Sequence, residues 1–328
     1  MMTKLNMTIS IITPVYNRSD CILRCMESVT QSKKNNTSHF IEQIIVDDGS
    51  TDNTPEIVKE YAKLHPHIHF IELPQNKGTN ASRNIAITKA KGEWCIFLDS
   101  DDYFVENAIE IITNVLEQHS GYKHYMFAPD DMQSSYKKNF IIKGAKEKIL
   151  LYPDFLNGHI TGDFVHVCNT NILRKHPFDE RIRIYEGVFF LQFYKDAQQM
   201  YFTNKVVTIR ERNRQDSVTR DTIRTNRKII ERNTINYELY LRYFGKELEM
   251  LGMQRRLSTI HINLLDNYIL LCEYKKAKQF IEKTKNINCN KKKLLHLCYK
   301  MRMGWIYRCL LKGYLIFKYE ILNKDLRL

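Results

Sequence analysis

Two acidic clusters each close an apolar run in this chain: Ile44–Ser50 (IIVDDGS) and Trp94–Asp102 (WCIFLDSDD). The apolar runs have the length and residue types of buried strands. The five aspartates in these stretches would repel one another unless a cation or hydrogen-bond donors neutralised them. In an α/β sheet, ligands bind just outside the carboxyl ends of the strands, where both clusters would lie. Their spacing therefore suggests a metal and nucleotide site.

Strand-like and helix-like segments alternate through the first third of the chain. The apolar patterns predict strands at residues 7–13, 41–46, 68–73 and 94–98. They predict helices that begin near Ser19 or Asp20, near Asp52, and near Asn80. We expect Pro14 to end the first strand, because proline lacks a backbone N–H. Four such units with short connections predict a doubly wound, largely parallel sheet.

Four distinct sequence blocks follow one another in the first third of the chain. They are Ile11–Arg18 (IITPVYNR), Val46–Thr54 (VDDGSTDNT), Asn76–Asn84 (NKG and ASRN) and Phe97–Asp102 (FLDSDD). Any one of them alone is weak, and Asp-Gly-Ser-Thr-Asp is more often an ordinary turn and helix cap. In this order and spacing, the four resemble glycosyltransferase family 2. The resemblance covers roughly residues 8 to 105. It implies a GT-A (Rossmann-like) fold, a nucleotide-sugar donor, a divalent cation and inversion at the anomeric carbon.

The resemblance also assigns the metal ligands. Asp101 is the implied ligand of Mn2+ or Mg2+, and Asp99 would assist through the ribose or a metal-bound water. Asp102 is a weaker candidate. Hard cations select oxygen ligands, and an Asp-x-Asp pair at a strand end supplies them in a compact turn. A cation there would stabilise the charge that develops on a departing sugar diphosphate.

The donor site implied by the resemblance surrounds these ligands. Asp47 or Asp48 would hydrogen-bond the base, and Lys77 and Arg83 would face the ribose or diphosphate. A basic segment after a predicted strand at residues 205–209 resembles a family loop that closes over the diphosphate, although an exposed edge strand is an equal alternative. The full predicted nucleotide-sugar set is Thr13, Pro14, Tyr16, Asp47, Asp48, Lys77, Arg83, Asp99, Ser100, Arg212 and Arg214.

The catalytic base is predicted in the middle segment. An inverting transfer needs a carboxylate to accept the proton of the acceptor hydroxyl. Glu186 matches the first position of a family Glu-Asp dipeptide, but Gly187 stands where Asp is common. Asp163 and Asp179 are the fallback candidates, and Glu186 could instead cap a helix that begins near Val188.

Charge divides the chain near residue 219. Residues 220–328 hold 24 Lys and Arg against 10 Asp and Glu, whereas residues 1–219 hold 26 against 27. Leu and Ile recur at helical spacing through this basic tail, with a break at residues 286–290. We therefore predict a GT-A catalytic domain at residues 1–219 and a basic helical region at 220–328. The nucleotide-sugar half would span about 1–105 and the acceptor half about 106–219.

The basic tail mixes Lys and Arg with Trp, Tyr and Leu, a composition typical of helices that lie on anionic lipid. A soluble helical subdomain with a charged outer face is the alternative, and nucleic-acid binding is the least favoured. The N-terminus has no apolar signal core, which favours the cytoplasm and the inner face of the plasma membrane. The sequence does not predict an oligomeric state.

These patterns together predict an inverting glycosyltransferase. It would move a sugar from a nucleotide-diphosphate donor to a hydroxyl of a saccharide or a lipid-linked glycan. A UDP-sugar is the leading candidate for the donor. Family habit suggests bacterial surface polysaccharide synthesis. The alternative is a catalytically inactive, membrane-docked protein that binds nucleotide sugar as a partner.

Overall fold

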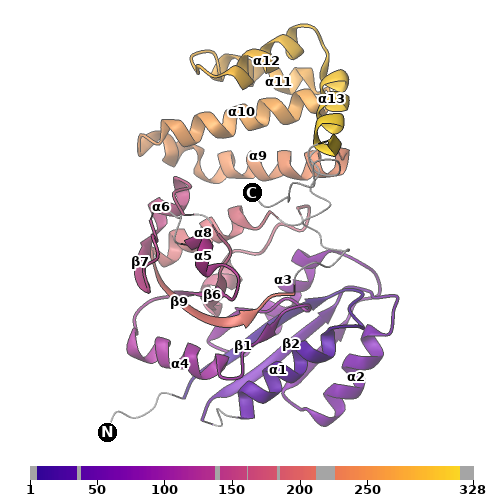
Figure 1. Ribbon diagram of the computed structural model, residues 1–328, viewed down its shortest axis with the longest axis vertical. Helices are drawn as coiled ribbons and strands as arrows, with labels where there is room; N and C mark the ends of the chain where they lie inside the picture. Colours follow the sequence, from indigo (N-terminus) through magenta and orange to yellow (C-terminus); the bar gives the residue numbers. More distant parts are fainter. Residues whose placement is uncertain are drawn as a thin grey trace. The chain divides into compact units, whose positions relative to one another are not determined.

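The computed structural model describes residues 6–34, 38–136, 141–160, 162–182, 185–211 and 226–317. Its chain folds as two compact units (Figure 1). The first unit comprises residues 1–180 and 189–212 and contains the sheet. The second comprises residues 181–188 and 213–328.

The first four strands form the parallel half of the sheet, in the order β3-β2-β1-β4. These strands are β1 (Thr8–Val15), β2 (Phe40–Asp47), β3 (Ile68–Glu72) and β4 (Trp94–Phe97). The helices between them are α1 (Ile22–Lys34), α2 (Thr54–Leu64) and α3 (Thr79–Lys89). Figure 1 shows α1 and α2 lying over one face of this half. The predicted alternation of strands and helices is confirmed, and all four strands end at one edge.

Pro14 does not end the first strand as predicted. β1 continues to Val15, and Pro14 lies opposite Val46 of β2. The carbonyl of Ile12 accepts a hydrogen bond from Leu98 at the end of β4. Alternate residues of a strand direct their backbone N–H and C=O groups to the same neighbouring strand. The backbone of Pro14, like that of Ile12, therefore faces the β4 side, where β4 has already ended. Its missing N–H therefore removes no bond from the sheet.

The second half of the sheet is mixed. β8 (Val165–Asn169) runs antiparallel to β4 and to β6 (His124–Pro129), and β9 (Gln199–Ile209) runs parallel to β6. The short strands β5 (Tyr103–Phe104) and β7 (Glu147–Leu151) pair antiparallel with β9. The remaining helices of the segment are α4 (Ala108–Gln118), α5 (Gln133–Tyr136), α6 (Tyr152–Leu156), α7 (Thr170–Lys175) and α8 (Gly187–Ala197). As a result, β6 and β9 end at the same edge as β1–β4.

A histidine pair lies in the core of this mixed half. His124 Nε2 and His166 Nδ1 are 3.0 Å apart, and His124 is fully buried. Burial, together with the neighbouring Arg83, lowers the pKa of His166 to about 3. Burial and the neighbouring His166 lower the pKa of His124 well below its usual value. Both rings are therefore neutral in the folded protein at neutral pH.

This pair predicts a loss of stability in mild acid. Below about pH 6.5 the unfolded chain takes up protons that the folded pair excludes. The free energy of unfolding should fall by about 1.4 kcal/mol per pH unit for each histidine, down towards the folded pKa. The measurement is urea unfolding between neutral and mildly acidic pH, followed by Trp94 fluorescence in a Trp305→Phe background. Of the two tryptophans, only Trp94 belongs to the sheet unit. A His124→Phe/His166→Phe protein should lose most of this slope, and an unchanged slope would contradict the assignment.

The second unit is helical, which confirms the predicted helical tail. Its helices are α9 (Arg227–Met250), α10 (Gln254–Leu270), α11 (Tyr274–Lys283), α12 (Asn290–Lys300) and α13 (Gly304–Ile316). The central helix α10 packs against the other four. The predicted break at residues 286–290 lies between α11 and the first turn of α12. Within the described ranges, no helix is both long enough and apolar enough to cross a bilayer.

Candidate active site

Polar residues follow several strands where those strands meet the common edge of the sheet. Asp47 and Asp48 come at the end of β2, and the Asp99–Asp102 turn follows β4. Asp130 and Asp131 follow β6, and Arg210 and Glu211 follow β9. The sheet topology therefore brings together the two acidic clusters that the sequence singles out, and adds a third.

Asp47 and Asp48 are both buried and hold backbone in place. Asp47 accepts hydrogen bonds from the Ser50 N–H at 2.8 Å and from the Ser50 hydroxyl. Burial raises the pKa of Asp47, although the bonds from Ser50 oppose this shift. Asp48 accepts from the N–H groups of Lys77 and Gly78 at 2.7 and 2.8 Å. These carboxylates shape their own turn and the loop before α3, and a contact with the base stays a prediction.

We expect Asp48→Ala to destabilise the first unit by about 2 to 4 kcal/mol, because two backbone donors lose a charged, buried acceptor. Chemical denaturation followed by Trp94 fluorescence measures the change. Glu60→Gln is the matched control, because the Glu60 side chain is 71% exposed and pairs with Lys63 on the surface of α2. The control should change stability by less than about 0.5 kcal/mol. Equal effects of the two substitutions would contradict the clamping role of Asp48.

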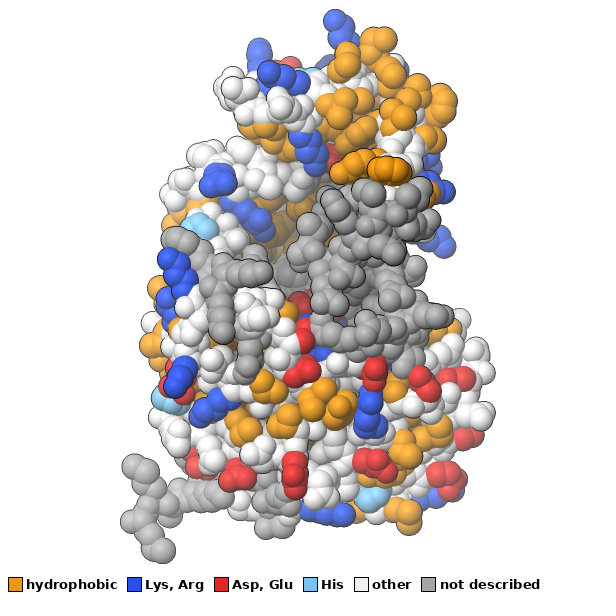
Figure 2. Space-filling model, viewed as in Figure 1, with side chains coloured by type: hydrophobic (Ala, Val, Ile, Leu, Met, Phe, Trp, Pro, Cys, Tyr) orange, Lys and Arg blue, Asp and Glu red, His pale blue; other side chains and the backbone are white. Residues whose placement is uncertain are grey.

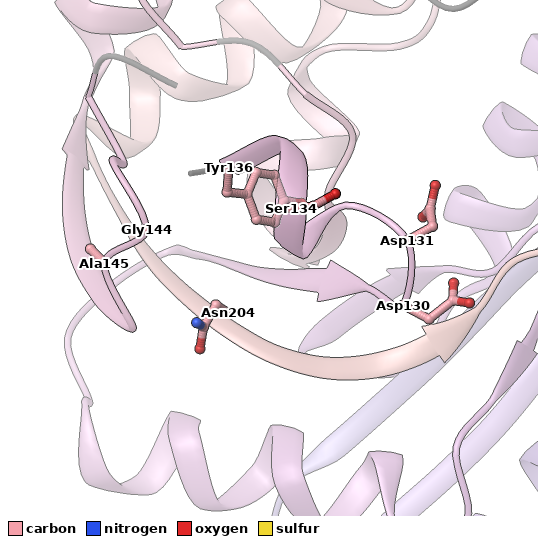
Figure 3. A pocket seen from close by; sticks show the side chains of 7 residues that line it. All are labelled: Asp130, Asp131, Ser134, Tyr136, Gly144, Ala145 and Asn204. Atoms are coloured by element: carbon pink, nitrogen blue, oxygen red, sulfur yellow. The ribbon is translucent and has the colours of Figure 1, made fainter. Parts of the chain in front are cut away.

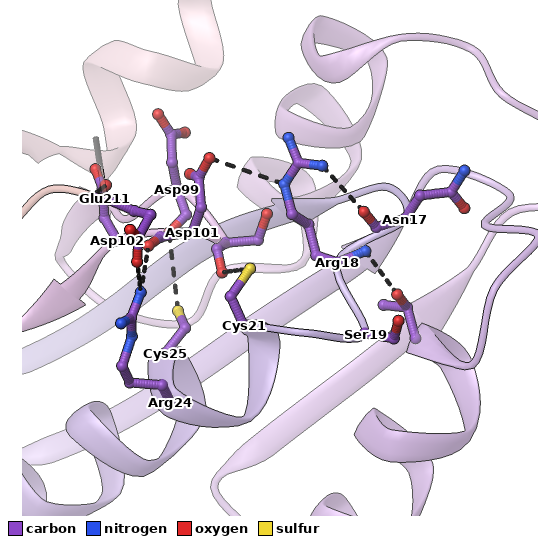
Figure 4. A network of polar contacts seen from close by, with 12 residues as sticks. Asn17, Arg18, Ser19, Cys21, Arg24, Cys25, Asp99, Asp101, Asp102 and Glu211 are labelled. Atoms are coloured by element: carbon purple, nitrogen blue, oxygen red, sulfur yellow. Dashed lines mark hydrogen bonds and ion pairs between the residues drawn. The ribbon is translucent and has the colours of Figure 1, made fainter. Parts of the chain in front are cut away.

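The Asp99–Asp102 turn holds three carboxylates with different partners (Figure 4). Asp99 Oδ1 lies 3.0 Å from a guanidinium nitrogen of Arg83, and the Asp99 side chain is 54% exposed. Asp101 Oδ2 lies 3.8 Å from Arg18 Nε. Asp102 Oδ1 accepts the N–H of Glu211 at 3.1 Å. Asp99 and Asp101 therefore retain oxygens that solvent reaches, whereas Asp102 faces inward.

Negative charge is concentrated in this turn. Burial and, after it, the charges of Asp99 and Asp101 together raise the pKa of Asp102 to about 8. Carboxylate oxygens crowded in this way suit a hard divalent cation. Within the described residues, no three acidic, histidine or cysteine side chains converge to close a metal site by themselves. In proteins, Mg2+ is often held by one or two carboxylates together with substrate phosphates.

Arginines from separate elements surround the turn. Arg83 of α3 is buried, and its guanidinium lies over the rings of Phe97 and Phe178 at 5.8 and 5.6 Å. Arg24 of α1 forms an ion pair with Glu211 and also donates to the Asp101 carbonyl at 3.3 Å. Arg18, Arg24 and Glu211 are site residues for which the sequence predicted no role. The signal for Arg18 was its place in the first block, beside Tyr16.

The other predicted donor residues lie near the same edge. Thr13 and Pro14 are buried at the end of β1, and the Thr13 hydroxyl accepts from the Gln43 amide at 3.0 Å. Tyr16 is half-buried, Ser100 is buried, and the Lys77 side chain is exposed. Arg212 and Arg214 lie outside the described residues.

The three candidate bases come from different segments of the chain. Glu186 is half-buried, directly precedes α8, and belongs to the second unit. Asp163 is exposed and lies 2.9 Å from Arg210 Nη1. The half-buried Asp179 uses its carbonyl to accept the Asn80 side-chain amide at 2.9 Å.

A pocket of about 450 Å³ lies beside the third acidic cluster (Figure 3). Its described lining is Asp130, Asp131, Ser134, Tyr136, Gly144, Ala145 and Asn204. Arg210 contacts two of these residues: its backbone N–H donates to Asp130 at 3.0 Å, and its guanidinium donates to both oxygens of Asp131 at 3.0 and 3.1 Å. Sequence reasoning missed Asp130 and Asp131, although they follow a strand as Asp47 and Asp48 do.

The sequence model described as "Glycosyl transferase family 2" matches residues 10–180, more than half of the chain. The chain belongs to glycosyl transferase family 2. Family membership makes it a glycosyltransferase, as predicted, and the match extends from β1 through α7. Of the residues discussed above, it covers both acidic clusters and the Asp130–Asp131 pair, but not Glu186 or Arg210.

Two curated relatives are bacterial glycosyltransferases. The chain is 28% identical over 214 residues to the GalNAc(5)-diNAcBac-PP-undecaprenol beta-1,3-glucosyltransferase of Campylobacter jejuni, covering 64% of this chain and 67% of that one. It is 39% identical over 109 residues to the putative teichuronic acid biosynthesis glycosyltransferase TuaG of Bacillus subtilis. That second match covers 33% of this chain and 42% of TuaG, so the chain spans less than half of that relative.

Solved structures share the fold of this family 2 chain. S. aureus TarS 1–349 in complex with UDP aligns with a TM-score of 0.56 at 18% identity, covering 94% of this chain and 91% of that one. The mannosyltransferase PcManGT from Pyrobaculum calidifontis, in complex with GDP-Man and Mn2+, aligns at 0.55 and 14% identity, covering 98% and 89%. At these identities the likeness shows the fold, and it confirms the predicted GT-A class.

Proposed function

We propose that this chain transfers a sugar, with inversion, from a UDP-sugar to a hydroxyl of a saccharide or a lipid-linked glycan in bacterial surface polysaccharide synthesis. The observation that carries the proposal is the Asp99–Asp102 turn, where two accessible carboxylates lie beside Arg83 and Arg18 at the ligand-binding edge of the sheet. Such a mixture of anionic and cationic groups suits a diphosphate that is bound together with a cation. The Campylobacter relative named for a lipid-linked glycan supports the acceptor class.

Asp101 and Asp99 would hold Mn2+ or Mg2+. The oxygen donors fit a hard divalent cation, and so does the crowding of Asp99 and Asp101, whose charges act with burial to raise the pKa of Asp102 to about 8. When bound, the cation supplies Lewis-acid stabilisation of the departing diphosphate. Arg83 is fixed by its contact with Asp99, so its guanidinium is oriented before a donor arrives. We further propose that Arg212 and Arg214 contact the diphosphate.

The pocket beside β6 is our proposed position for the acceptor sugar. Its lining offers the carboxylates of Asp130 and Asp131 and the amide of Asn204, groups that hydrogen-bond neighbouring sugar hydroxyls. β6 and β9 end at the same edge as β4, so an acceptor there would lie on the donor side of the sheet. We propose that Glu186 accepts the proton of the attacking hydroxyl.

A non-catalytic nucleotide-sugar binder is the second candidate. One observation favours it: Gly187 replaces the usual Asp of the family dipeptide. The two candidates share the donor site and differ only in turnover. Both therefore predict donor binding, and only the first predicts nucleotide release.

A thermal-shift screen tests the proposal first. The purified chain is heated with UDP-, GDP-, dTDP- or CMP-sugars, each with Mn2+, Mg2+ or EDTA. A ligand that binds only the folded protein must raise the unfolding temperature. We expect a metal-dependent rise with UDP-sugars, followed by UDP release on addition of acceptor. A shift with another nucleotide would overturn the donor assignment, and no shift with any of them would overturn the donor site.

A further inference from the structure

The last two described helices carry an unusual set of exposed apolar side chains. Seven large hydrophobic residues on and between α12 and α13 are 46–69% exposed: Leu294, Leu297, Met301, Trp305, Leu310, Tyr314 and Phe317. Figure 2 shows hydrophobic side chains gathered in the part of the second unit where Figure 1 labels α13, with Lys and Arg around them. We call these seven residues the apolar surface. Single exposed hydrophobic residues are common, but a contiguous group marks an interaction site.

The spacing of the apolar surface gives it two ordered stripes. Leu294, Leu297 and Met301 follow one another at three and four residues, so they share one face of α12. Leu310, Tyr314 and Phe317 do the same along α13. The stripes are therefore regular features of two helices.

The helix that carries most of this surface is firmly attached to its unit. Tyr307 and Leu311 of α13 pack against a cluster formed by Ile230, Leu270 and Leu271. Gly304 begins α13 so close to α10 that a Cβ atom there would lie 2.0 Å from the Ile269 carbonyl oxygen. The exposure of Leu310, Tyr314 and Phe317 therefore occurs on a helix whose other contacts are well formed.

The segment that carries the apolar surface contains basic residues and no acidic ones. Residues 283–317 contain nine basic residues and no Asp or Glu: Lys283, Lys285, Lys291, Lys292, Lys293, Lys300, Arg302, Arg308 and Lys312. Lys291 pairs with Asp266 at 2.6 Å. Over the described part of the chain, no carboxylate lies within ion-pair distance of Lys293, Lys300, Arg308 or Lys312. These four cations are available to an external anionic partner.

We propose that α12 and α13 dock this protein on the surface of an anionic lipid bilayer. Exposed Leu, Trp, Tyr and Phe enter the boundary between head groups and acyl chains, while the interleaved Lys and Arg bind lipid phosphates. The helices lie on the membrane without crossing it, in agreement with the lengths of the described helices. This inference goes beyond the proposed function and does not depend on it.

Charge argues against two other occupants of the same surface. A second copy of the chain would bring two sets of uncompensated Lys and Arg together, and like charges repel. A nucleic acid would neutralise the cations, but its phosphate backbone would leave the exposed Leu and Phe side chains in water. An anionic bilayer satisfies both the apolar and the charged groups.

Vesicle cosedimentation tests the proposal. The probes are vesicles of phosphatidylcholine alone and vesicles with equal parts of phosphatidylcholine and phosphatidylglycerol. We expect the wild-type chain to bind only the anionic vesicles, and to release them in high salt. Replacing Lys293, Lys300, Arg308 and Lys312 together with Gln should weaken partitioning about 100-fold or more, since each cation contributes several-fold. The Leu310→Ser/Tyr314→Ser/Phe317→Ser protein should bind the anionic vesicles much more weakly than the wild type. The binding that remains should still decrease with added salt, because the Lys and Arg residues are unchanged.

Matched controls separate this surface from general charge and hydrophobicity. Gln at four exposed lysines of the first unit, Lys34, Lys89, Lys91 and Lys123, should leave vesicle binding unchanged. Leu64→Ser/Met250→Ser, at side chains that are 79% and 86% exposed, should also leave it unchanged. Circular dichroism verifies that each variant keeps its helices. Wild-type protein that fails to bind anionic vesicles, or control variants that bind as poorly as the test variants, would overturn the proposal. So would lipid-free self-association that the serine substitutions abolish.

Discussion

Asp101→Asn is expected to lower the rate of sugar transfer about 1,000-fold, because a neutral amide is a poor ligand for a hard cation and the barrier rises by several kcal/mol. Asp101 combines the features that this role requires. It lies at the carboxyl edge of the sheet, one carboxylate oxygen faces Arg18 at 3.8 Å, and its side chain is 27% exposed. Initial rates of UDP release at saturating donor measure the effect.

Two further measurements make the Asp101 result specific. The thermal shift produced by UDP with Mn2+ should shrink to the shift seen with EDTA, which a purely structural role would not cause. Glu106→Gln is the control, because Glu106 is exposed and only four residues beyond the turn. A fully active Asp101→Asn enzyme would remove Asp101 from the metal site and move the assignment to Asp99.

Glu186→Gln is expected to lower transfer about 100- to 10,000-fold while donor binding stays unchanged, because glutamine cannot accept the acceptor proton. Support comes from the sequence, because Glu186 matches the first position of the family Glu-Asp dipeptide. Single-turnover rates and UDP affinity, measured on the same preparation, separate loss of chemistry from loss of binding.

The alternative bases supply the controls for Glu186. Asp163→Asn and Asp179→Asn should keep most activity, and Glu180→Gln, at a neighbouring exposed carboxylate, should keep all of it. High activity in Glu186→Gln together with loss in Asp163→Asn would transfer the role of base to Asp163. High activity in all four variants would show that none of these carboxylates is the base.

The first half of the fold could be predicted from sequence because its signals are local. Strands β1–β4 are short apolar runs bounded by polar turns, and α1–α3 have apolar residues at helical spacing. Only Pro14 was misjudged, since its effect depends on where the neighbouring strand β4 ends. The order of β5–β9 could not be predicted, because antiparallel pairs such as β6 with β8 join segments far apart in sequence. No local pattern encodes those pairings.

The candidate site also has a part that could be predicted from sequence and a part that could not. The position of both acidic clusters followed from the rule that ligands bind at the carboxyl ends of strands. The side chains that contact these clusters could not be predicted in the same way, because they come from distant parts of the sequence. Arg24, for example, pairs with Glu211 from a position 187 residues away. The bonds from Asp48 to the backbone of Lys77 and Gly78 likewise depend on how two loops meet.

Arg210 and Glu211, the two residues that follow β9, constrain how this enzyme could be recombined with a relative. Arg210 is tied to Asp130, Asp131 and Asp163, and the N–H of Glu211 is tied to Asp102. A chimera that exchanged the segment carrying Asp130 and Asp163 but cut the chain before Arg210 would pair foreign side chains with a resident arginine. Every one of these contacts stays within one parent if residues 102–211 are exchanged together as one block. Because Arg18, Arg24 and Arg83 pair with Asp101, Glu211 and Asp99, even a block that began before Asp99 would need the same three arginines in the receiving parent.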